Sequence, residues 1–415
     1  MRQIYLDHAS TTPVRPEVLD TMLPYFAEDY GNPSSIYPLG QSASDVVARS
    51  RDTLAHLIGA NPREVFFTGG GTESDNWAIK GFARANATKG RHIVTSCIEH
   101  HAVLHACQAL EREGFEVTYL PVDEHGLVRP EDLEASLRPD TILVSIMFAN
   151  NEIGTIQPIA ALSAIVHRHG ATFHTDAVQV FGHEPIDVDE LGIDMLSASA
   201  HKLYGPKGVG MLYVRKGVKL ANLLDGGQQE RGKRATTENV PGIVGFAKAA
   251  QLAIDELAIE HERQQALRDH AIERVLAEIP HAKLNGSWEH RLASNVNFSF
   301  EFIEGEGMLL QLAARGICVS SGSACTSGSL DPSHVLLGIG LPHEIAHGSL
   351  RLTLGRSTTQ EDVDFAIDSL KATLDSLRMM SPLYEDFKHG QVDSVIERFA
   401  VEGFPYTSQL AMTSH

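Results

Sequence analysis

Residues 64–76 read EVFFTGGGTESDN, an apolar run that enters three glycines and continues into a helical pattern. Thr72 is a candidate helix N-cap, with Asp75 three residues further on. Backbone N–H groups at such a helix start bind anions, and glycines let a phosphate group approach them closely. A tight strand-to-helix turn without a ligand is an equally fair interpretation of this stretch alone. The spacing differs from the G-x-G-x-x-G dinucleotide pattern, and no Lys-Ser or Lys-Thr pair follows, as it would in a P-loop.

Strands and helices alternate along residues 64–214. Apolar runs predict strands at residues 64–68, 92–96, 116–122, 141–147, 171–175, 194–198 and 210–214. Amphipathic stretches such as 102–112 and 159–169 predict helices, and a glycine follows each of them. This alternation predicts an α/β domain with a mostly parallel seven-stranded sheet covered on both faces. The last strands follow one another without full helices, which predicts mixed strand directions there.

A second, smaller domain is predicted beyond the sheet. Residues 224–239 are too polar for a core and indicate an extended functional loop, and a long helical segment follows at 241–279. Strands are then expected at residues 294–300, 316–319 and 350–354, and helices at 306–315 and 360–379. We expect a large domain of residues 13–258, a small α+β domain of residues 1–12 with 259–385, and a tail of residues 386–415 that is partly disordered.

Composition excludes several classes of protein. The 415 residues carry 34 Lys and Arg against 53 Asp and Glu, a formal charge of −19, which disfavours binding to nucleic acid or to an anionic membrane. Hydrophobic residues make up 43% of the chain, enough for an ordinary core. No apolar run approaches the ~18 residues of a membrane span, and no signal peptide is expected. The four cysteines form no C-x-x-C pair, so we expect reduced thiols in a cytoplasmic protein.

Two charged side chains follow predicted strands. Asp176 ends one strand, at the carboxyl edge of the sheet where open α/β folds bind ligands, and Lys202 directly follows a later one. The carboxylate suits a protonated pyridine nitrogen, as in enzymes that use pyridoxal 5'-phosphate (PLP). A desolvated lysine is a nucleophile for an aldehyde. Alone, Asp176 is also an ordinary turn cap and Lys202 an ordinary surface lysine; their order after the glycine turn favours a PLP site.

Residues 320–329 read SSGSACTSGS, small residues with Cys325 near the middle. Nothing in this stretch can anchor in a core, so we expect a mobile loop with an exposed thiol. A Gly/Ser linker with an incidental cysteine is the alternative. Cys318 alternates with apolar neighbours and is expected to be buried filler, and Cys97 and Cys107 are expected to be structural.

Together these segments resemble the cysteine desulfurases, which have the PLP-dependent class V aminotransferase fold (type I). The nitrogenase-type, NifS-like group with its long SSGSACTSGS loop is the most similar. The resemblance rests on the motifs at residues 5–7, 30–35, 98–100, 149–152, 174–179, 199–202, 229–232, 304–307, 320–329 and 349–351. It leaves out only about the last 30 residues, and the order and spacing of the motifs are specific.

The resemblance implies a role for each site residue. Lys202 would hold PLP covalently, Asp176 would pair with its pyridine nitrogen, and His100 would stack on the ring and act as acid and base. The remaining contacts implied are Asn151 and Gln179 with the ring substituents, and Gly71, Thr72, Ser199, His201 and Thr237 of a second subunit with the phosphate. Arg351, with Asn151, would bind the carboxylate of L-cysteine. Cys325 would receive the sulfur as a persulfide, and no metal is implied.

The resemblance also implies partners. A homodimer with shared sites is expected, because the threonine comes from the second subunit. An iron–sulfur assembly scaffold or another sulfur acceptor would take the persulfide, in nitrogen fixation or in housekeeping cluster supply.

Three positions depart from the family pattern. Thr236 stands where relatives usually have glycine, Tyr37 stands where a histidine is usual, and Gly69 with Gly70 loosens the phosphate turn. None removes a group that the chemistry needs.

Three other functions compete with this reading. An aminotransferase or lyase would use the same pocket but needs no thiol loop. A metal enzyme would use histidines at positions 101, 105, 167 and 169, which lack an H-E-x-x-H pattern. A non-catalytic sulfur-assembly partner need not keep Lys202, Asp176 and Cys325.

Overall fold

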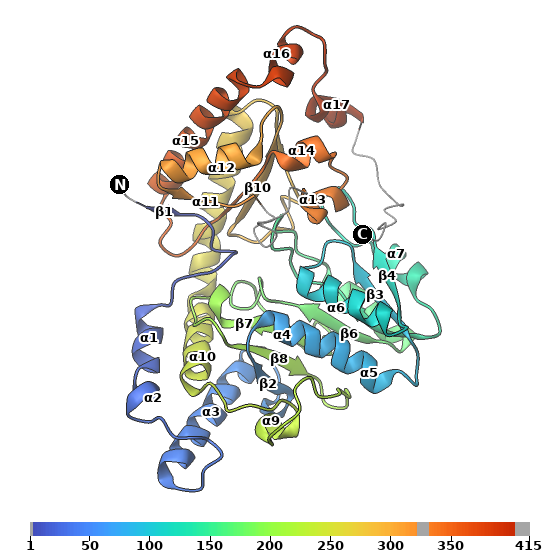
Figure 1. Ribbon diagram of the computed structural model, residues 1–415, viewed down its shortest axis with the longest axis vertical. Helices are drawn as coiled ribbons and strands as arrows, with labels where there is room; N and C mark the ends of the chain where they lie inside the picture. The colour runs from blue at the N-terminus through green and yellow to red at the C-terminus, as the bar shows by residue number, and fades with distance from the viewer. Residues whose placement is uncertain (1–2, 322–331, 403–415) are drawn as a thin grey trace.

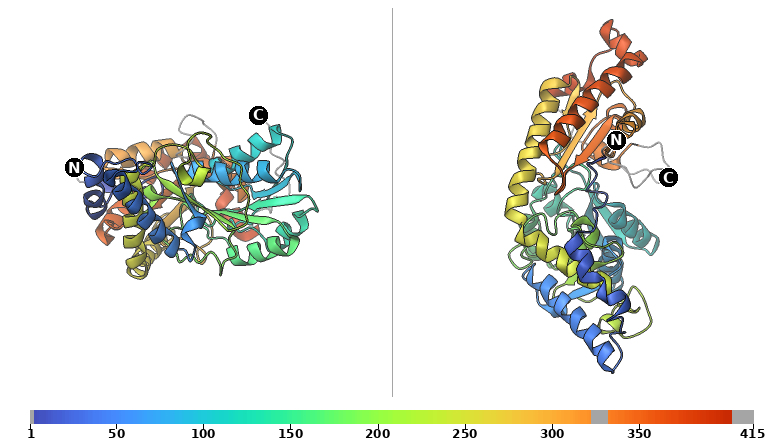
Figure 2. Two further views of the ribbon diagram at one scale, coloured as in Figure 1. Left: turned by 90° about the horizontal axis from the view of Figure 1, so that it is seen from below. Right: turned by 90° about the vertical axis from the view of Figure 1, so that its left-hand side faces the viewer.

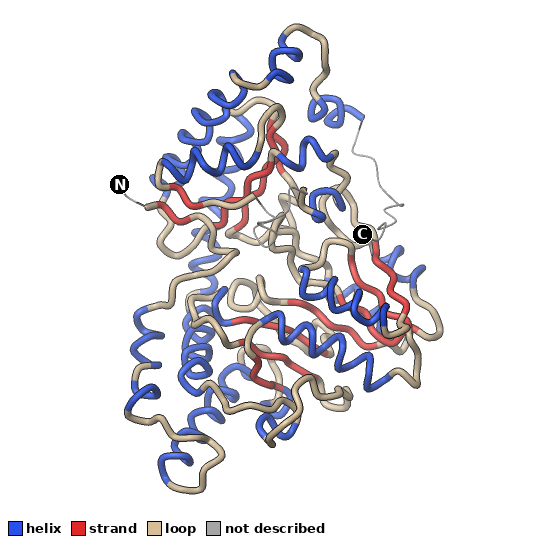
Figure 3. The backbone as a smooth tube through the Cα atoms, in the orientation of Figure 1, coloured by secondary structure: helices blue, strands red, loops and turns tan. Residues whose placement is uncertain are grey.

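Two packed halves, joined by a pair of long helices, make up the molecule (Figure 1). The computed structural model describes residues 3–321 and 332–402, so that Cys325 and the residues after 402 lie outside the described part. Strands gather in two separate groups, one in each half (Figure 3).

A seven-stranded sheet forms the centre of the larger half. Its strands lie in the order β2-β8-β7-β6-β5-β3-β4, and β8 runs antiparallel to both of its neighbours while the others are parallel. The strands are β2 (Val65–Thr68), β3 (His92–Ser96), β4 (Glu116–Leu120), β5 (Thr141–Ser145), β6 (Thr172–Asp176), β7 (Met195–Ser199) and β8 (Gly210–Val214). The predicted α/β class and the mixed directions at the end of the strand series are confirmed.

Helices cover both faces of this sheet, so every residue of β3, β5 and β7 is buried. On one face, Trp77 and Leu110 pack against Ile93 and Met195. On the other face, helices α3 and α10 contribute Leu54 and Phe246 to the larger core. The helical segments of this half are α1 (Pro16–Met22), α2 (Pro24–Ala27), α3 (Pro38–His56), η1 (Pro62–Glu64), α4 (Gly71–Asn76), η2 (Trp77–Gly81), α5 (Phe82–Asn86), α6 (His101–Arg112), α7 (Pro130–Ser136), α8 (Ile159–His169), η3 (Ala200–Lys202), α9 (Gln229–Gly232) and α10 (Val240–Asp255).

The smaller half has its own core around two short sheets. Strands β9 (Ala282–Leu284), β10 (Asn295–Phe300) and β12 (Ser349–Thr353) are antiparallel, while β1 (Ile4–Tyr5) pairs in parallel with β11 (Ile317–Cys318). The N-terminal strand therefore completes this half, as predicted. Its helices are α11 (Leu257–Glu278), α12 (Gly305–Ala314), α13 (His334–Gly338), α14 (His343–His347), α15 (Gln360–Met379), α16 (Pro382–Lys388) and α17 (Val395–Glu402). The larger core also includes Val335, Leu336 and Ile345 of α13 and α14 and so crosses the predicted boundary, and we keep the predicted division as a proposal.

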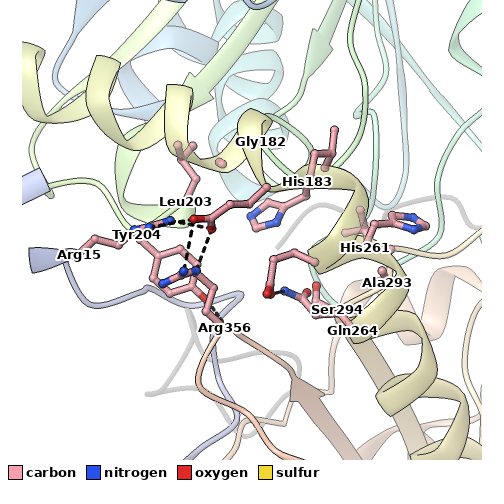
Figure 4. Close-up of a pocket in the computed structure, with 15 residues that line it drawn as sticks. Arg15, Gly182, His183, Leu203, Tyr204, His261, Gln264, Ala293, Ser294 and Arg356 are labelled. Atoms are coloured by element: carbon pink, nitrogen blue, oxygen red, sulfur yellow. Dashed lines mark hydrogen bonds and ion pairs between the residues drawn. The ribbon is translucent and has the colours of Figure 1, made fainter. Parts of the chain in front are cut away.

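Glu256 breaks the long helical segment into α10 and α11, which run along one side of the molecule (Figure 2, right). Its carboxylate accepts hydrogen bonds from Arg15 at 2.9 and 3.0 Å and from Arg356 at 3.1 Å (Figure 4). Arg15 precedes α1, and Arg356 follows β12. These ion pairs therefore join the N-terminal arm, the helix junction and the smaller half around a cavity.

The glycine turn differs from the prediction in one respect. Helix α4 begins at Gly71 with Gly70 as its N-cap, so the expectation that Thr72 caps the helix is wrong. Gly70 has φ 152°, a conformation that only glycine adopts readily, and this lets the helix start earlier. A Cβ atom at Gly71 would lie 2.5 Å from Val178 Cγ2, so the turn also needs glycine to pass the end of β6.

The polar loop of residues 224–239 is fastened to β2, the edge strand of the large sheet. Buried Glu230 accepts two hydrogen bonds of 2.7 Å from Arg51 and one of 2.9 Å from the Phe67 N–H. The same loop contains Thr236 at φ 106°, a strained conformation for a β-branched residue. This strain explains physically why glycine suits the position.

Replacing Thr236 with glycine is expected to stabilise the protein. Glycine adopts positive φ without steric cost, so Thr236→Gly should raise the thermal midpoint by about 2 °C in calorimetry. Thr237→Gly is the matched control, because Thr237 has no positive φ and the added backbone freedom should lower the midpoint. Equal shifts for both variants would contradict the strain at Thr236.

Candidate active site

A pocket at the carboxyl edge of the large sheet brings the predicted site residues together. It holds about 1070 Å³ of empty space, open to solvent, and it is lined by Ala9, Ser10, Gly71, Thr72, Asp75, His100, Met147, Ala149, Asn151, Asp176, Val178, Gln179, Ser199, His201, Lys202 and Arg351. Ten of the predicted residues therefore share one pocket. Thr237 is exposed and lies away from the pocket of its own chain, and Cys325 falls outside the described residues.

Ser10 connects the two cationic side chains of the pocket. Its carbonyl oxygen and that of Ala9 accept hydrogen bonds from Lys202 Nζ at 2.8 and 2.5 Å. Its hydroxyl accepts from Arg351 Nη2 at 3.0 Å, and Asp7 Oδ1 pairs with the same nitrogen at 2.8 Å. Ser10 thus bonds to an amine and to a guanidinium that line the same pocket.

Arg351 is buried on β12, with only 3% of its surface exposed, and its Nε is buried without a hydrogen-bond partner among the described residues. Arg351 Nη1 donates to the Asn151 carbonyl at 2.9 Å, which fixes the guanidinium plane. A buried, unsatisfied donor next to a fixed fork suits a bidentate carboxylate ligand.

Asp176 ends β6, and its Oδ1 accepts a hydrogen bond from the Val178 N–H at 2.9 Å. The carboxylate therefore caps the following turn, as one interpretation of the sequence expected, and it also faces the pocket. Burial raises the pKa of Asp176 to about 6, against the opposing effects of the Val178 hydrogen bond and the Lys202 charge. A cation brought to this carboxylate would favour its ionised form.

His100 is the N-cap of α6, and its Nδ1 accepts a hydrogen bond from the Ala102 N–H at 3.1 Å. Since Nδ1 is an acceptor, the neutral ring carries its proton on Nε2. Burial and, to a lesser degree, the Lys202 charge lower the pKa of His100 to about 4. The ring is therefore neutral at neutral pH and offers one N–H donor.

The glycine turn continues the pocket into an open basin of about 1240 Å³. Gly71, Thr72, Ser199 and His201 line both spaces. His201 Nδ1 lies 3.1 Å from Thr11 Oγ1, and burial lowers the pKa of His201 to about 4. Backbone N–H groups, two hydroxyls and a neutral imidazole thus face a space suited to a phosphate group.

The donor set fits PLP. Lys202 supplies an amine for an aldehyde, Asp176 a carboxylate for a ring nitrogen, and the basin around the glycine turn supplies the donors for a phosphate. Gln179 reaches the same pocket and donates to the Ala9 carbonyl at 3.1 Å. Apart from Thr237, the described residues needed to hold the cofactor are therefore present in one chain.

The two ends of the segment that contains Cys325 are attached to the pocket. Ser320 and Arg351 form an antiparallel bridge through both backbone hydrogen bonds, 2.6 and 3.2 Å long. After the segment, Ser333 Oγ donates to Glu152 Oε2 at 2.5 Å, next to Asn151 in the chain. The described residues on both sides of positions 322–331 are therefore bonded to Arg351 or to the neighbour of Asn151.

In the described part of the chain, the remaining cysteines and the histidines of the metal alternative lie outside this pocket. Burial raises the pKa of the Cys97 thiol to about 12, as expected for a structural cysteine. Cys318 is half-buried rather than fully buried and accepts a hydrogen bond from Gln3, so the filler interpretation is wrong in part. The four histidines of the metal alternative are divided between α6 and α8, and those on α8 bond to Asp194 and to the Arg138 carbonyl.

Sequence reasoning missed Ser10 and Asp7 as site residues. Tyr5-Leu6-Asp7 belongs to a recognisable motif, but nothing in it shows that the carboxylate meets a residue 344 positions away. Asp75 was also misjudged, because its spacing from Thr72 indicated a cap although its side chain is 1% exposed and faces the pocket.

Arg351→Lys is expected to raise the KM for the amino-acid substrate about 10- to 100-fold. Lysine keeps the charge but lacks the planar fork, and a hydrogen bond to a charged group contributes about 1.5–3 kcal/mol. Steady-state kinetics check this, with Arg168→Lys, on the exposed side of α8, as the matched control. An unchanged KM in Arg351→Lys would remove Arg351 from substrate binding.

Comparisons with known proteins identify the family of this chain. The profile of the class V aminotransferases matches residues 4–365. A protein of Methanosarcina thermophila called cysteine desulfurase IscS is 57% identical over 382 residues, which cover 92% of this chain and 94% of the relative. The protein of that name from Dictyoglomus turgidum is 54% identical, over 93% of this chain and 98% of the relative.

Solved structures show the same likeness. A NifS-like protein superposes with a TM-score of 0.86 at 39% identity, covering 91% of this chain and all of the other. A structure described as SspA in complex with cysteine gives a TM-score of 0.75 at 38% identity, covering 85% of this chain and 98% of the other.

Proposed function

The chain belongs to the class V aminotransferase family and is a PLP-dependent cysteine desulfurase; from this premise we propose that it converts L-cysteine to L-alanine and receives the sulfur on Cys325 as a persulfide. The single observation that carries this proposal is Ser10, which holds Lys202 through its carbonyl and Arg351 through its hydroxyl. The amine and the carboxylate of a small α-amino acid would meet these two groups in one pocket.

Arg351 binds and orients the substrate. Its buried Nε and its two terminal nitrogens offer a fixed fork to the carboxylate, and Asp7 and Asn151 keep that fork in place. PLP, when bound, supplies an electron sink for the pair released at Cα. Lys202 would hold PLP through Nζ, and the same nitrogen would accept the Cα proton. Asp176 holds a negative charge against the ring nitrogen.

His100 and Cys325 act on the sulfur. The neutral His100 ring carries its proton on Nε2 and serves as the acid–base group beside the substrate sulfur. Cys325 attacks that sulfur as a thiolate, because the thiol is a poor nucleophile. The S–S bond forms as the S–Cβ bond breaks, the electron pair stays with the carbon fragment, and protonation of that fragment gives alanine.

Partners follow from the same proposal. We propose a homodimer in which Thr237 of one subunit completes the phosphate site of the other, supported by its exposed position outside its own pocket. An iron–sulfur assembly scaffold, or another acceptor protein, takes the persulfide sulfur in the cytoplasm. Among the described helices, none is long and apolar enough to cross a membrane. A nitrogenase destination stays a prediction, which growth of a disrupted strain on dinitrogen would test.

Incubation with L-cysteine tests this function. Alanine should accumulate without a reductant to about one equivalent per subunit, and catalytically, with equal sulfide, once a thiol reductant removes the persulfide. Pyruvate or a transaminated product in place of alanine would favour the aminotransferase or lyase alternative. No product at all, with PLP bound, would favour a non-catalytic partner.

A further inference from the structure

A second carboxyl group lines the active-site pocket together with Asp176. Asp75 of α4 is 1% exposed, lines the same pocket and has a buried Oδ1 without a hydrogen-bond partner among the described residues. No step of the proposed reaction uses it. A buried, unsatisfied carboxylate would carry a large desolvation cost, so its presence needs a physical reason.

The surroundings of Asp176 favour a negatively charged carboxylate more than those of Asp75 do. Asp176 accepts a hydrogen bond from the Val178 N–H at 2.9 Å and lies near the positive charge of Lys202. Both interactions favour the ionised form of Asp176. Asp75 interacts with the Ser197 hydroxyl, which opposes the rise of its pKa without outweighing burial, and with the ring of His174, whose Nε2 lies 3.8 Å from Asp75 Oδ1. Burial lowers the pKa of His174 to about 3, so this ring brings no positive charge.

A third acidic side chain, Glu99, also lies near Asp75. Glu99 Oε1 accepts hydrogen bonds from Ser96 Oγ at 2.6 Å and from the Met147 N–H at 2.9 Å. Its Oε2 has no hydrogen-bond partner among the described residues. Burial raises the pKa of Glu99 to about 8, and that of Asp75 lies well above its usual range because of burial and of the Asp176 charge. Like charges in one buried site cannot all be ionised.

We propose that Asp75 is a positioning residue that remains a neutral acid, so that the negative charge of the Asp75–Asp176 pair stays on Asp176, where the cofactor nitrogen binds. The inference rests on the proposed function only for the role of Asp176. Were Asp75 ionised as well, the two charges would repel each other and Asp176 would itself take up a proton. Asp75 thus keeps the proton of the pair, so that Asp176 stays ionised.

Infrared spectroscopy of the PLP-bound protein tests this directly. The wild type should show the band of a protonated carboxylic acid at neutral pH, and Asp75→Asn should lack one component of it. Asp45→Asn, an exposed position on α3, is the matched control and should keep the full band. An unchanged band in Asp75→Asn would show that Asp75 is ionised and would overturn the proposal.

The pH dependence of thermal stability gives an independent reading. A folded-state pKa above the unfolded value of 3.8 stabilises the fold at low pH, and this contribution is lost as pH rises through the folded pKa. Asparagine cannot ionise, so the midpoint of Asp75→Asn should gain on the wild type by about 2 °C or more between about pH 5 and about pH 9. A difference in thermal midpoint between Asp75→Asn and the wild type that stays constant or falls as the pH rises would contradict the proposal.

Cofactor affinity separates Asp75 from Asp176. Asp75→Asn mimics the neutral acid and should bind PLP within about threefold of the wild type, while Asp176→Asn should bind it at least about tenfold more weakly. A large loss in Asp75→Asn would mean that its charge is needed. None of these three readouts requires desulfurase turnover, so the inference and the proposed reaction can fail separately.

Discussion

Lys202→Ala is expected to lower desulfurase turnover by at least about 10⁴-fold, because it removes both the amine that holds PLP and the base that takes the Cα proton. Lys202 Nζ is held in the pocket by the Ala9 and Ser10 carbonyls. Borohydride reduction followed by peptide mapping measures the covalent link.

The wild type should carry the reduced PLP adduct on the peptide that contains Lys202, and Lys202→Ala should carry none. Lys216→Ala, an exposed residue after β8, is the control and should keep both the adduct and the turnover. A normal amount of borohydride-fixed adduct in Lys202→Ala would place the covalent link on a different residue.

Cys325→Ala is expected to lower sulfide release by at least about 100-fold while leaving the cofactor site intact. An intramolecular thiol acts at an effective concentration far above that of thiols in solution, so external thiols replace it poorly. The variant should keep its PLP absorbance and should still change its spectrum when L-cysteine is added, because Arg351 and Lys202 are untouched. Sulfide assays and absorbance spectra on the same sample separate these two effects.

Cys318→Ser is the matched control, because Cys318 is half-buried on β11 and only accepts a hydrogen bond from Gln3. It should keep its sulfide release. Undiminished turnover in Cys325→Ala, or a loss of turnover in Cys318→Ser alone, would refute the assignment of the nucleophile.

Much of the fold could be predicted because local pattern and tertiary structure agree. The strand at residues 92–96 and the helix at residues 360–379 have the predicted bounds, since an apolar run and an amphipathic stretch with a clear capping box define them locally. The start of α4 could not be placed, because the conformation of Gly70 depends on its packing beside β7 and β8 rather than on the N-cap preference of Thr72.

The site residues also divide into those that the local sequence predicts and those that depend on tertiary packing. Lys202, Asp176 and His100 stand at strand or helix ends with recognisable neighbours, and they line the pocket as the sequence predicted. Ser10 could not be predicted, because it meets Lys202 and Arg351 across 192 and 341 residues of chain. Asp75 could be seen in the sequence, but its burial against Asp176 depends on how α4 packs on the sheet.

The transfer of sulfur to Cys325 is tested most directly in a single turnover, with enzyme in excess of L-cysteine and no reductant. Peptide mass spectrometry should find one added sulfur atom on the peptide that contains Cys325, equal in amount to the alanine formed. Sulfur on another cysteine, or alanine formed with no persulfide at position 325, would contradict the mechanism.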